Sequence, residues 1–402
     1  MLNTPFAPWP SFSDEEADAV AAVLRSNRVN YWTGEECRAF EREFADWADC
    51  DHAIALANGT VALDLALHGL GVGTVNGGRA SDEVIVTPRT FLASVSCVVN
   101  AGARPVFADV DRDSGNLSAA TIAAVLTPET RAVIAVHLGG WPCEMDSIMD
   151  LADKHGFKVI EDCAQAHGAR YKGRSVGSIG HVGAWSFCQD KIMTTGGEGG
   201  MVTTLDRALW SRMWSFKDHG KSWEAVYDHP HPPGFRWLHE SFGTNWRMIE
   251  MQAAIGRIQL RRMAGWTAER RRNADILRAA TAPFSRSDGP VRAPRLQGEG
   301  HVHAEYKHYA YVRPERLAEG WDRDRIVAEI NARGVPCFQG SCSEVYLEKA
   351  FDGTGFRPLQ RLPVARELGE TSLMWLVHPG LTGEQMALAA AVTDEVLRAA
   401  SA

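Results

Sequence analysis

A lysine at the start of a glycine-rich turn is the first group in this sequence that could perform chemistry. Lys191 follows an apolar run at 182–187 and precedes the segment Thr194-Thr195-Gly196-Gly197-Glu198-Gly199-Gly200. A lysine that is desolvated, or that lies near another cation, loses its proton more easily and can form a Schiff base with an aldehyde. An ordinary loop lysine is the alternative interpretation. A nucleotide-binding phosphate loop is disfavoured, because its lysine follows the glycines and here the order is reversed.

Two acidic residues end an apolar run at 157–162, and the second is a candidate ligand group. Asp162 falls at the carboxyl end of a predicted strand, the edge at which open α/β sheets bind their ligands. A carboxylate there could hold the protonated nitrogen of a pyridine ring, which pyridoxal phosphate (PLP) requires to withdraw electrons. Either Asp162 or its neighbour Glu161 could instead meet a cation or a metal, although the sequence offers no further ligands at a suitable spacing.

Two further segments could bind the other parts of such a cofactor. Asn58-Gly59-Thr60 lies between a predicted strand and a predicted helix. Backbone N–H groups at a helix start, together with the Thr60 hydroxyl, can bind a phosphate without a lysine. The same tripeptide is also a plain turn and cap. Phe91 follows the next strand and could stack on a flat ring or fill the core.

Metal and disulfide chemistry have weaker support. The eight cysteines, the last of them Cys342, follow no regular spacing and no Cys-x-x-Cys pattern, which favours buried free thiols over disulfides or structural zinc. His301, His303 and His308 form the only histidine cluster. Strand alternation would separate His303 from His308, so we interpret the cluster as surface and expect no metal site.

The elements that must position these residues alternate along the first 250 residues. Helices are predicted at 13–25, 61–70, 92–101, 119–126 and 145–155. Strands are predicted at 53–57, 83–87, 104–110, 131–137, 157–162, 182–187 and 200–204. Because the strands are continuously apolar, the pattern predicts a largely parallel sheet covered by helices on both faces.

The pattern changes in the remaining residues. Two amphipathic helices are predicted at 247–263 and 267–280, and the Pro/Gly/Ser-rich stretch 281–300 is the best candidate for a boundary between subdomains. We expect a large domain over residues 1–250, and connecting helices with a small C-terminal α/β domain over residues 251–402. The small domain should contain strands at 306–312 and 374–378 and helices at 323–333 and 383–399. The segments 72–82 and 221–243 are predicted to be loops, either functional or merely exposed.

Composition excludes several classes of partner. The 402 residues carry 42 Lys+Arg against 50 Asp+Glu, a formal net charge of −8. This balance gives no overall basic field, so we expect no nucleic acid and no membrane as partner. The arginine-rich stretch 257–272 is interpreted as the solvated face of a helix. Neither an export signal nor an apolar run of about eighteen residues is present, which predicts a soluble cytoplasmic protein.

In their order along the chain these segments resemble the DegT/DnrJ/EryC1/StrS family of sugar aminotransferases, which belong to fold type I of the PLP-dependent transferases. The resemblance extends from about residue 10 to about residue 382. It implies a large domain with a mostly parallel seven-stranded sheet and a smaller C-terminal α/β domain. The segments that carry it are Asn58-Gly59-Thr60, Asp82-Glu83-Val84-Ile85-Val86, Glu161-Asp162-Cys163-Ala164-Gln165, Ser186-Phe187 with Lys191, Gly197-Glu198-Gly199-Gly200, Asn245-Trp246-Arg247-Met248 and Glu250-Met251-Gln252-Ala253-Ala254-Ile255-Gly256.

The resemblance implies a role for each candidate residue. Lys191 resembles the lysine that forms the Schiff base and moves the proton, and Asp162 the partner of the pyridine nitrogen. Gln165 would lie near the phenolic oxygen, and Phe91 would stack on the ring. The phosphate would be bound by Gly59, Thr60 and Ser186. Asn245 would reach the phosphate of the neighbouring subunit's cofactor, which implies a homodimer with shared active sites.

The activity implied is amination of a keto sugar, nucleotide-linked and carrying its keto group at carbon 3 or 4, with L-glutamate as donor. Such products serve polysaccharide or antibiotic biosynthesis. Amination of a keto-cyclitol or another non-nucleotide polyol is the first alternative, and a non-catalytic regulatory protein that keeps the fold is the second. One departure from the family pattern is Asn58, which stands where serine is common.

Overall fold

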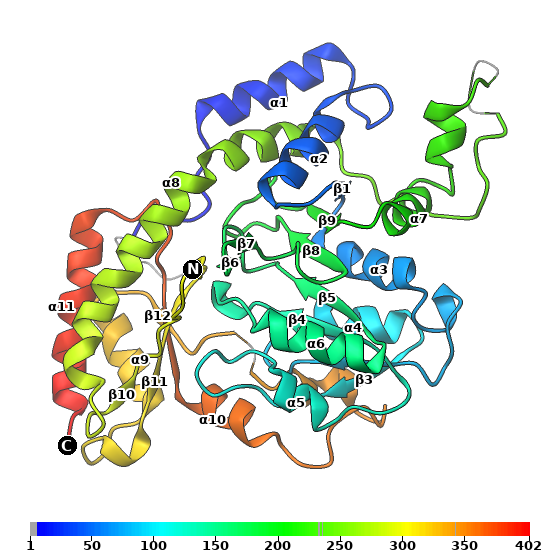
Figure 1. The fold of residues 1–402 in the computed structure, drawn as a ribbon. Coiled ribbons are helices and arrows are strands. Elements are labelled where there is room, and N and C mark those ends of the chain that lie inside the picture. Colours follow the sequence, from blue (N-terminus) through cyan, green and yellow to red (C-terminus); the bar gives the residue numbers. More distant parts are fainter. Residues whose placement is uncertain (1–5, 232–233, 235, 342) are drawn as a thin grey trace.

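The computed structural model describes residues 6–231, 234, 236–341 and 343–402, and its largest element is a seven-stranded sheet (Figure 1). The strand order is β1-β9-β8-β5-β4-β2-β3. Only β9 is antiparallel to its neighbours in this sheet, and the other pairs are parallel. The mostly parallel sheet expected from the sequence is confirmed. Its strands are β1 (His52–Leu56), β2 (Glu83–Val86), β3 (Arg104–Phe107), β4 (Thr130–Val136), β5 (Lys158–Asp162), β8 (Val182–Ser186) and β9 (Gly200–Thr204).

The central strands of this sheet are buried on both faces, so alternate side chains enter two different cores. Val84 and Val86 of β2 pack in the core that contains helices α3 (Gly59–Leu70) and α4 (Ala93–Asn100). Ile85 lies between them and packs on the other face, with α5 (Ala119–Ala123) and α6 (Met145–His155). Because successive strand side chains point to opposite faces, a strand covered on both sides must be apolar throughout.

Residues after the long helix α8 (Glu250–Thr281) form an antiparallel sheet of order β10-β11-β13-β12 with its own core. Ala274 and Leu277 of α8 belong to that core. The chain also returns to the large domain, because the amide of Val345 donates to the carbonyl of Pro88 at 2.9 Å. The elements of the small domain are β10 (Val291–Arg292), β11 (His308–Val312), α9 (Arg323–Ala332), β12 (Cys337–Phe338), α10 (Pro363–Thr371), β13 (Ser372–Trp375) and α11 (Gly383–Ala400).

Helix α8 is continuous over 32 residues, so the prediction of two helices at 247–263 and 267–280 was wrong. Figure 1 shows α8 running from α1 and α2 at one end to α11 at the other. Packing therefore supports the helix on both sides of Gly265, and this outweighs the weak helix propensity of one glycine. The other helices of the large domain are α1 (Asp14–Ser26), α2 (Glu36–Trp47) and α7 (Arg207–Lys217).

The arginines of α8 form a solvated face only in part, so the expectation from the sequence was partly right. Arg261, Arg271 and Arg272 are exposed, and the others join α8 to its neighbours. Arg257 pairs with Glu43 of α2 at 2.6 Å, and Arg262 pairs with Glu15 of α1 at 2.6 Å. Arg270 is 1% exposed and lies over the ring of Trp9. The sequence could not separate a solvated arginine face from one that pairs with acids far away in the chain.

The two segments that the sequence singled out as loops differ in character. Residues 72–82 close on themselves, because Oδ2 of Asp82 accepts hydrogen bonds from the amides of Gly73 (3.0 Å) and Arg79 (2.9 Å). The 221–243 segment, green at the upper right of Figure 1, projects from the body of the molecule. It is anchored by Trp223, whose ring lies 5.0 Å from that of Trp214. Residues 232, 233 and 235 of this segment lie outside the described residues.

The remaining elements are short. No helix in the described part of the chain is long and apolar enough to cross a membrane. A small hairpin and several single helical turns complete the fold: β6 (Arg170–Tyr171), β7 (Arg174–Ser175), Thr74–Asn76, Leu138–Gly140, Glu224–Asp228, Ala282–Phe284, Pro314–Arg316, Val345–Leu347 and Lys349–Phe351.

The continuity of α8 can be tested with two glycines of the same helix. At exposed Gly265 an added Cβ meets no atom within 4 Å, so Gly265→Ala is expected to raise the free energy of unfolding by about 0.5–1 kcal/mol. At Gly256 a Cβ would lie 2.7 Å from the Phe40 ring, so Gly256→Ala is expected to destabilise by about 1–3 kcal/mol. Urea unfolding measures both, and a destabilising Gly265→Ala would mean that the helix breaks there.

Candidate active site

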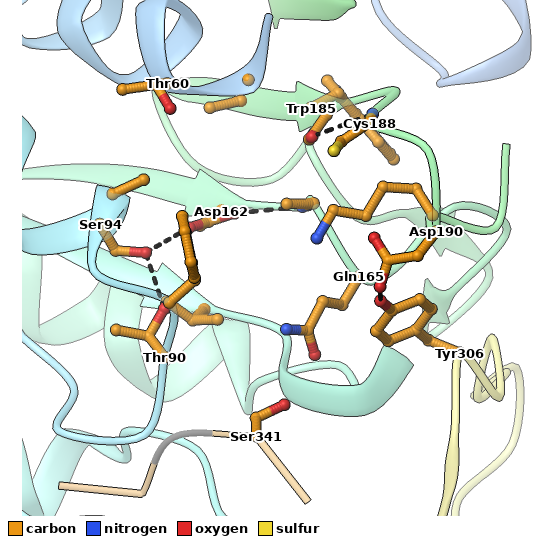
Figure 2. Close-up of a pocket in the computed structure, with 18 of the residues that line it drawn as sticks. Thr60, Thr90, Ser94, Asp162, Gln165, Trp185, Cys188, Asp190, Tyr306 and Ser341 are labelled. Atoms are coloured by element: carbon orange, nitrogen blue, oxygen red, sulfur yellow. Dashed lines mark hydrogen bonds between the residues drawn. The ribbon is translucent and has the colours of Figure 1, made fainter. Parts of the chain in front are cut away.

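One cavity of about 860 Å³ lies between the carboxyl edge of the large sheet and the small domain. The ends of β5 and β8 and the start of α3 line one side, and Phe338, Ser341 and Met374 of the small domain line the other. Figure 2 shows the Thr90, Ser94 and Asp162 side chains facing Asp190 and Tyr306 across this space. The cavity brings together seven of the eight predicted site residues, namely Gly59, Thr60, Phe91, Asp162, Gln165, Ser186 and Lys191.

Asp162 is the buried acid of the cavity, with 5% of its surface exposed. Ser94 Oγ donates to its Oδ2 at 2.8 Å, and the amide of Ala164 donates to its Oδ1 at 3.1 Å. Thr90 Oγ1 lies 2.7 Å from Ser94 Oγ and extends this chain of hydrogen bonds (Figure 2). No cationic side chain among the described residues pairs with Asp162, so the carboxylate is oriented but not neutralised. Sequence analysis missed Thr90 and Ser94, whose four-residue spacing near a helix start was the available signal.

Glu161, the neighbouring acid, faces the opposite side of β5 and has a structural role. His137 Nε2 lies 3.0 Å from its Oε2, and the amides of Gly177, Ile179 and Gly180 donate to its two oxygens at 2.9, 2.8 and 2.6 Å. Burial alone would raise the pKa of Glu161, but these hydrogen bonds lower it below its ordinary value. Cys163 lies close to His137 and Glu161, but hydrogen bonds already use the histidine and carboxylate atoms that would bind a metal.

The start of α3 and the end of β8 approach each other closely where they line the cavity. A Cβ added to Gly59 would lie 2.5 Å from Ser186 Cβ and 2.8 Å from Ser186 Oγ, so only glycine fits there. Asn58 Oδ1 accepts from the amide of Val61 at 3.0 Å and caps α3, the role a serine would also fill. The amides at the start of α3 and the Ser186 hydroxyl therefore lie together at a helix N-terminus, an arrangement that binds anions.

Lys191 lies in a turn that is fixed from several directions. Its carbonyl accepts a hydrogen bond from Trp9 Nε1 at 2.7 Å, and the nearby amide of Thr194 donates to Oε1 of Gln259 in α8 at 2.8 Å. The half-buried side chain reaches the cavity, where Nζ lies 5.5 Å from the centre of the Tyr306 ring. The Tyr306 hydroxyl in turn donates to Asp190 (Figure 2).

Phe91 and Gln165 border the middle of the cavity. Phe91 is 71% exposed, so the structure does not use it as core filler. Gln165 Oε1 accepts from the amide of Gly139 at 2.8 Å, which fixes the side chain and leaves its NH2 group for a ligand. Figure 2 shows Gln165 projecting into the cavity between Asp162 and Tyr306.

Other residues that the sequence singled out lie elsewhere. Asn245 is exposed and pairs through its backbone with Asp218, and it does not line the cavity of its own chain. Neither segment 72–82 nor the described residues of segment 221–243 line the cavity. His303 and His308 both lie near Glu305, at 3.7 and 3.6 Å, because the backbone turns at Glu305 with a φ of 49°. His308 is buried, so the prediction of a separated surface cluster was wrong.

The arrangement matches a known family over nearly the whole chain. The family model described as the DegT/DnrJ/EryC1/StrS aminotransferase family matches residues 10–393. The chain belongs to this family. Its members are PLP-dependent sugar aminotransferases, and the activity expected from the sequence is confirmed at this level.

Individual relatives cover most of the chain as well. An aminotransferase from Psychrobacter cryohalolentis, known from its X-ray structure, is 62% identical with a TM-score of 0.95, covering 98% of this chain and 99% of that one. The dTDP-3-amino-3,4,6-trideoxy-alpha-D-glucose transaminase of Streptomyces venezuelae is 35% identical over 94% of this chain and 91% of its own. The L-glutamine:2-deoxy-scyllo-inosose aminotransferase of Streptomyces kanamyceticus is 39% identical over 84% and 77%, respectively.

Removing the charge of Glu161 is expected to affect mainly stability, and removing the charge of its neighbour Asp162 mainly turnover. Glu161→Gln places an NH2 group against buried donors and should lower the free energy of unfolding by about 3–5 kcal/mol. Asp162→Asn keeps an oxygen that can accept a hydrogen bond, so stability should change by less than about 1 kcal/mol while turnover falls at least about 100-fold. Urea unfolding and steady-state kinetics of both variants test this. Normal turnover in Asp162→Asn would contradict the assignment.

Proposed function

We propose that this chain uses PLP to transfer an amino group from an amino-acid donor to the keto group of a nucleotide-linked sugar, at carbon 3 or 4. The single observation that carries the proposal is the cavity itself. It places an amine (Lys191), a buried carboxylate without a cationic partner (Asp162) and an anion-binding helix start (Gly59 with Ser186) around one space. These are the three groups that PLP requires of a protein.

The described residues fit the cofactor at both of its ends. The phosphate would bind at the start of α3, where a Cβ on Gly59 would collide with Ser186 and where the Thr60 hydroxyl also lies. The pyridine nitrogen would meet Asp162, whose charge has no other counter-ion among the described residues. When bound, PLP supplies an aldehyde carbon that carries the amino group and a ring that withdraws electrons from the substrate.

The side chains around this site would perform the remaining tasks. Asp162 would hold a proton on the ring nitrogen, and Ser94 and the amide of Ala164 would keep the carboxylate in the orientation that allows it. Lys191 Nζ would hold the aldehyde carbon and then move a proton at the reacting carbon. Phe91 would cover one face of the ring, and the NH2 group of Gln165 would donate to the phenolic oxygen.

The relatives support the choice of acceptor. The S. venezuelae relative is named for a dTDP-linked amino sugar, and its match covers more of both chains than the match to the cyclitol relative. A keto-cyclitol is the second candidate, because the S. kanamyceticus relative is named for 2-deoxy-scyllo-inosose. L-Glutamate is our proposed donor. A regulatory protein without activity is disfavoured because the lysine, the carboxylate and the phosphate-binding turn are all present.

We place the activity in the cytoplasm. Seven cysteines are free thiols, six of them buried, while Cys342 lies outside the described residues. Unpaired buried cysteines fit a reducing compartment.

Reduction with borohydride tests the role of Lys191. We expect the cofactor to become fixed to the peptide that contains Lys191, as measured by mass spectrometry, because a lysine at the aldehyde carbon forms the reducible bond. Lys191→Arg should lose both the label and all turnover, whereas Lys172→Arg, at an exposed lysine, should change neither. A label on another lysine would contradict the proposal.

Enzyme that has not been reduced identifies the acceptor. Enzyme loaded with the amino form of the cofactor is mixed with keto-sugar nucleotides and with 2-deoxy-scyllo-inosose. We expect the keto-sugar nucleotides to restore the absorbance of the aldehyde form, and a nucleoside diphosphate to inhibit this reaction. Conversion by the cyclitol alone, without inhibition by any nucleoside diphosphate, would favour the second candidate.

We also propose that two copies of the chain share their active sites, as the exposed position of Asn245 outside its own cavity supports. Lys191→Ala and Asn245→Asp should each be inactive, the second because a carboxylate would face the cofactor phosphate. If Asn245 serves the partner's site, a mixed dimer contains one site with both changes and one intact site. Mixing the two variants under subunit exchange should then restore about a quarter of wild-type activity. Exchange without recovered activity would place Asn245 in its own site.

A further inference from the structure

A second lysine lines the cavity and has no role in the chemistry described so far. Lys307 directly precedes β11 of the small domain and lies opposite the sheet edge that carries Asp162. Among the described lining residues, Lys191 and Lys307 are the only cationic side chains, and no arginine reaches the cavity. No carboxylate of the described residues lies within ion-pair distance of Lys307, and Asp190 already accepts the hydrogen bond from Tyr306.

Lys307 and Lys191 both lie near the ring of Tyr306. The Nζ atoms of Lys307 and Lys191 lie 4.7 and 5.5 Å from the centre of that ring, and the Tyr306 hydroxyl is held by Asp190. Burial lowers the pKa of Lys307 to about 8, with the charges of Arg270 and Lys191 acting in the same direction against the effect of Asp190. An anion that bound beside Lys307 would offset both the burial and this repulsion.

We propose that Lys307 binds the α-carboxylate of the amino-acid donor, an inference that rests on the proposed function. The donor reacts at the carbon that carries both its amino group and this carboxylate, and that carbon must lie within reach of Lys191. The α-carboxylate of the donor would therefore lie near Lys191, inside the cavity, where an anion without a partner is costly. A charge-assisted hydrogen bond from an ammonium group removes that cost. Glutamate and glutamine share this carboxylate, so the contact serves either donor.

Arg270 is the other cation near this end of the molecule, but it does not fit the same role. The residue is 1% exposed, and its guanidinium lies over Trp9 and donates to the carbonyl of Tyr306 at 3.4 Å. It does not line the cavity. The acceptor sugar carries no carboxylate next to its keto group. Lys307 would therefore contact the amino-acid donor in this way but not the keto-sugar acceptor.

The test measures the donor half-reaction alone, on holoenzyme, from the absorbance change of the bound cofactor. Lys307→Met is expected to raise the half-saturating concentrations of L-glutamate and of L-glutamine by about 10- to 100-fold each. The dissociation constant of PLP should stay within about threefold of the wild-type value. If Lys307 only supported the structure of the site, its loss would weaken PLP binding as well. Lys307→Arg should recover part of the loss, and Lys349→Met, at an exposed lysine outside the cavity, should match the wild type.

Two results would overturn the inference. A loss for L-glutamate without a loss for L-glutamine would place Lys307 at the side-chain carboxylate of the donor. Unchanged half-saturation for both amino acids would remove Lys307 from donor binding altogether. Failure of the proposed function is distinguishable from both, because wild-type protein would then show no cofactor absorbance change with either amino acid.

Discussion

A carboxylate without a counter-ion at the end of a buried strand is the constraint on which the site depends. Asp162 is 5% exposed, and among the described residues only Ser94 and Ala164 donate hydrogen bonds to its carboxylate. An ionised carboxylate in such surroundings is costly unless a positive group pairs with it. No residue in the described part of the chain provides that group, so the carboxylate is available to pair with a cationic group of a ligand. The fold keeps Asp162 in place because β5 lies in the middle of the sheet, paired with β4 and β8.

The surrounding structure holds the reactive groups on rigid elements. On the far face of β5, Glu161 accepts hydrogen bonds from His137 and from backbone amides at 177–180, and so fixes the loop that leads into β8. The turn that carries Lys191 is fixed by Trp9 and by Gln259 of α8. Gln259 in turn donates to Glu16 of α1 at 2.8 Å, so two helices distant in sequence stabilise the turn that carries Lys191.

The small domain completes the site from the other side. Tyr306, Lys307 and Ser341 face the large sheet because α8 contributes to both cores, and because the segment after β12 packs back against Pro88. One domain thus supplies the groups that would bind the cofactor, and the other supplies groups that would meet the substrates. A site of this kind depends on the packing between the domains as much as on either one alone.

The sequence by itself determined the seven strands of the sheet, and it predicted seven residues that the structure places around one cavity. Continuous apolar runs indicate strands of a sheet covered on both faces, because such strands admit few polar residues. Lys191, Asp162 and Gly59 each end or follow such a run. The alternation of side chains along β5 could also have predicted that Glu161 and Asp162 face opposite sides of the sheet, because neighbouring side chains of a strand enter opposite cores. Tertiary structure alone decided the rest. It joined two predicted helices into α8 and paired its arginines with α1 and α2. It also gathered His303 and His308 around Glu305 and brought Ser94, Tyr306 and Lys307 into the cavity. Apart from the local grouping around Glu305, these contacts join residues far apart in the chain. Local pattern carries no information about which distant surfaces will meet.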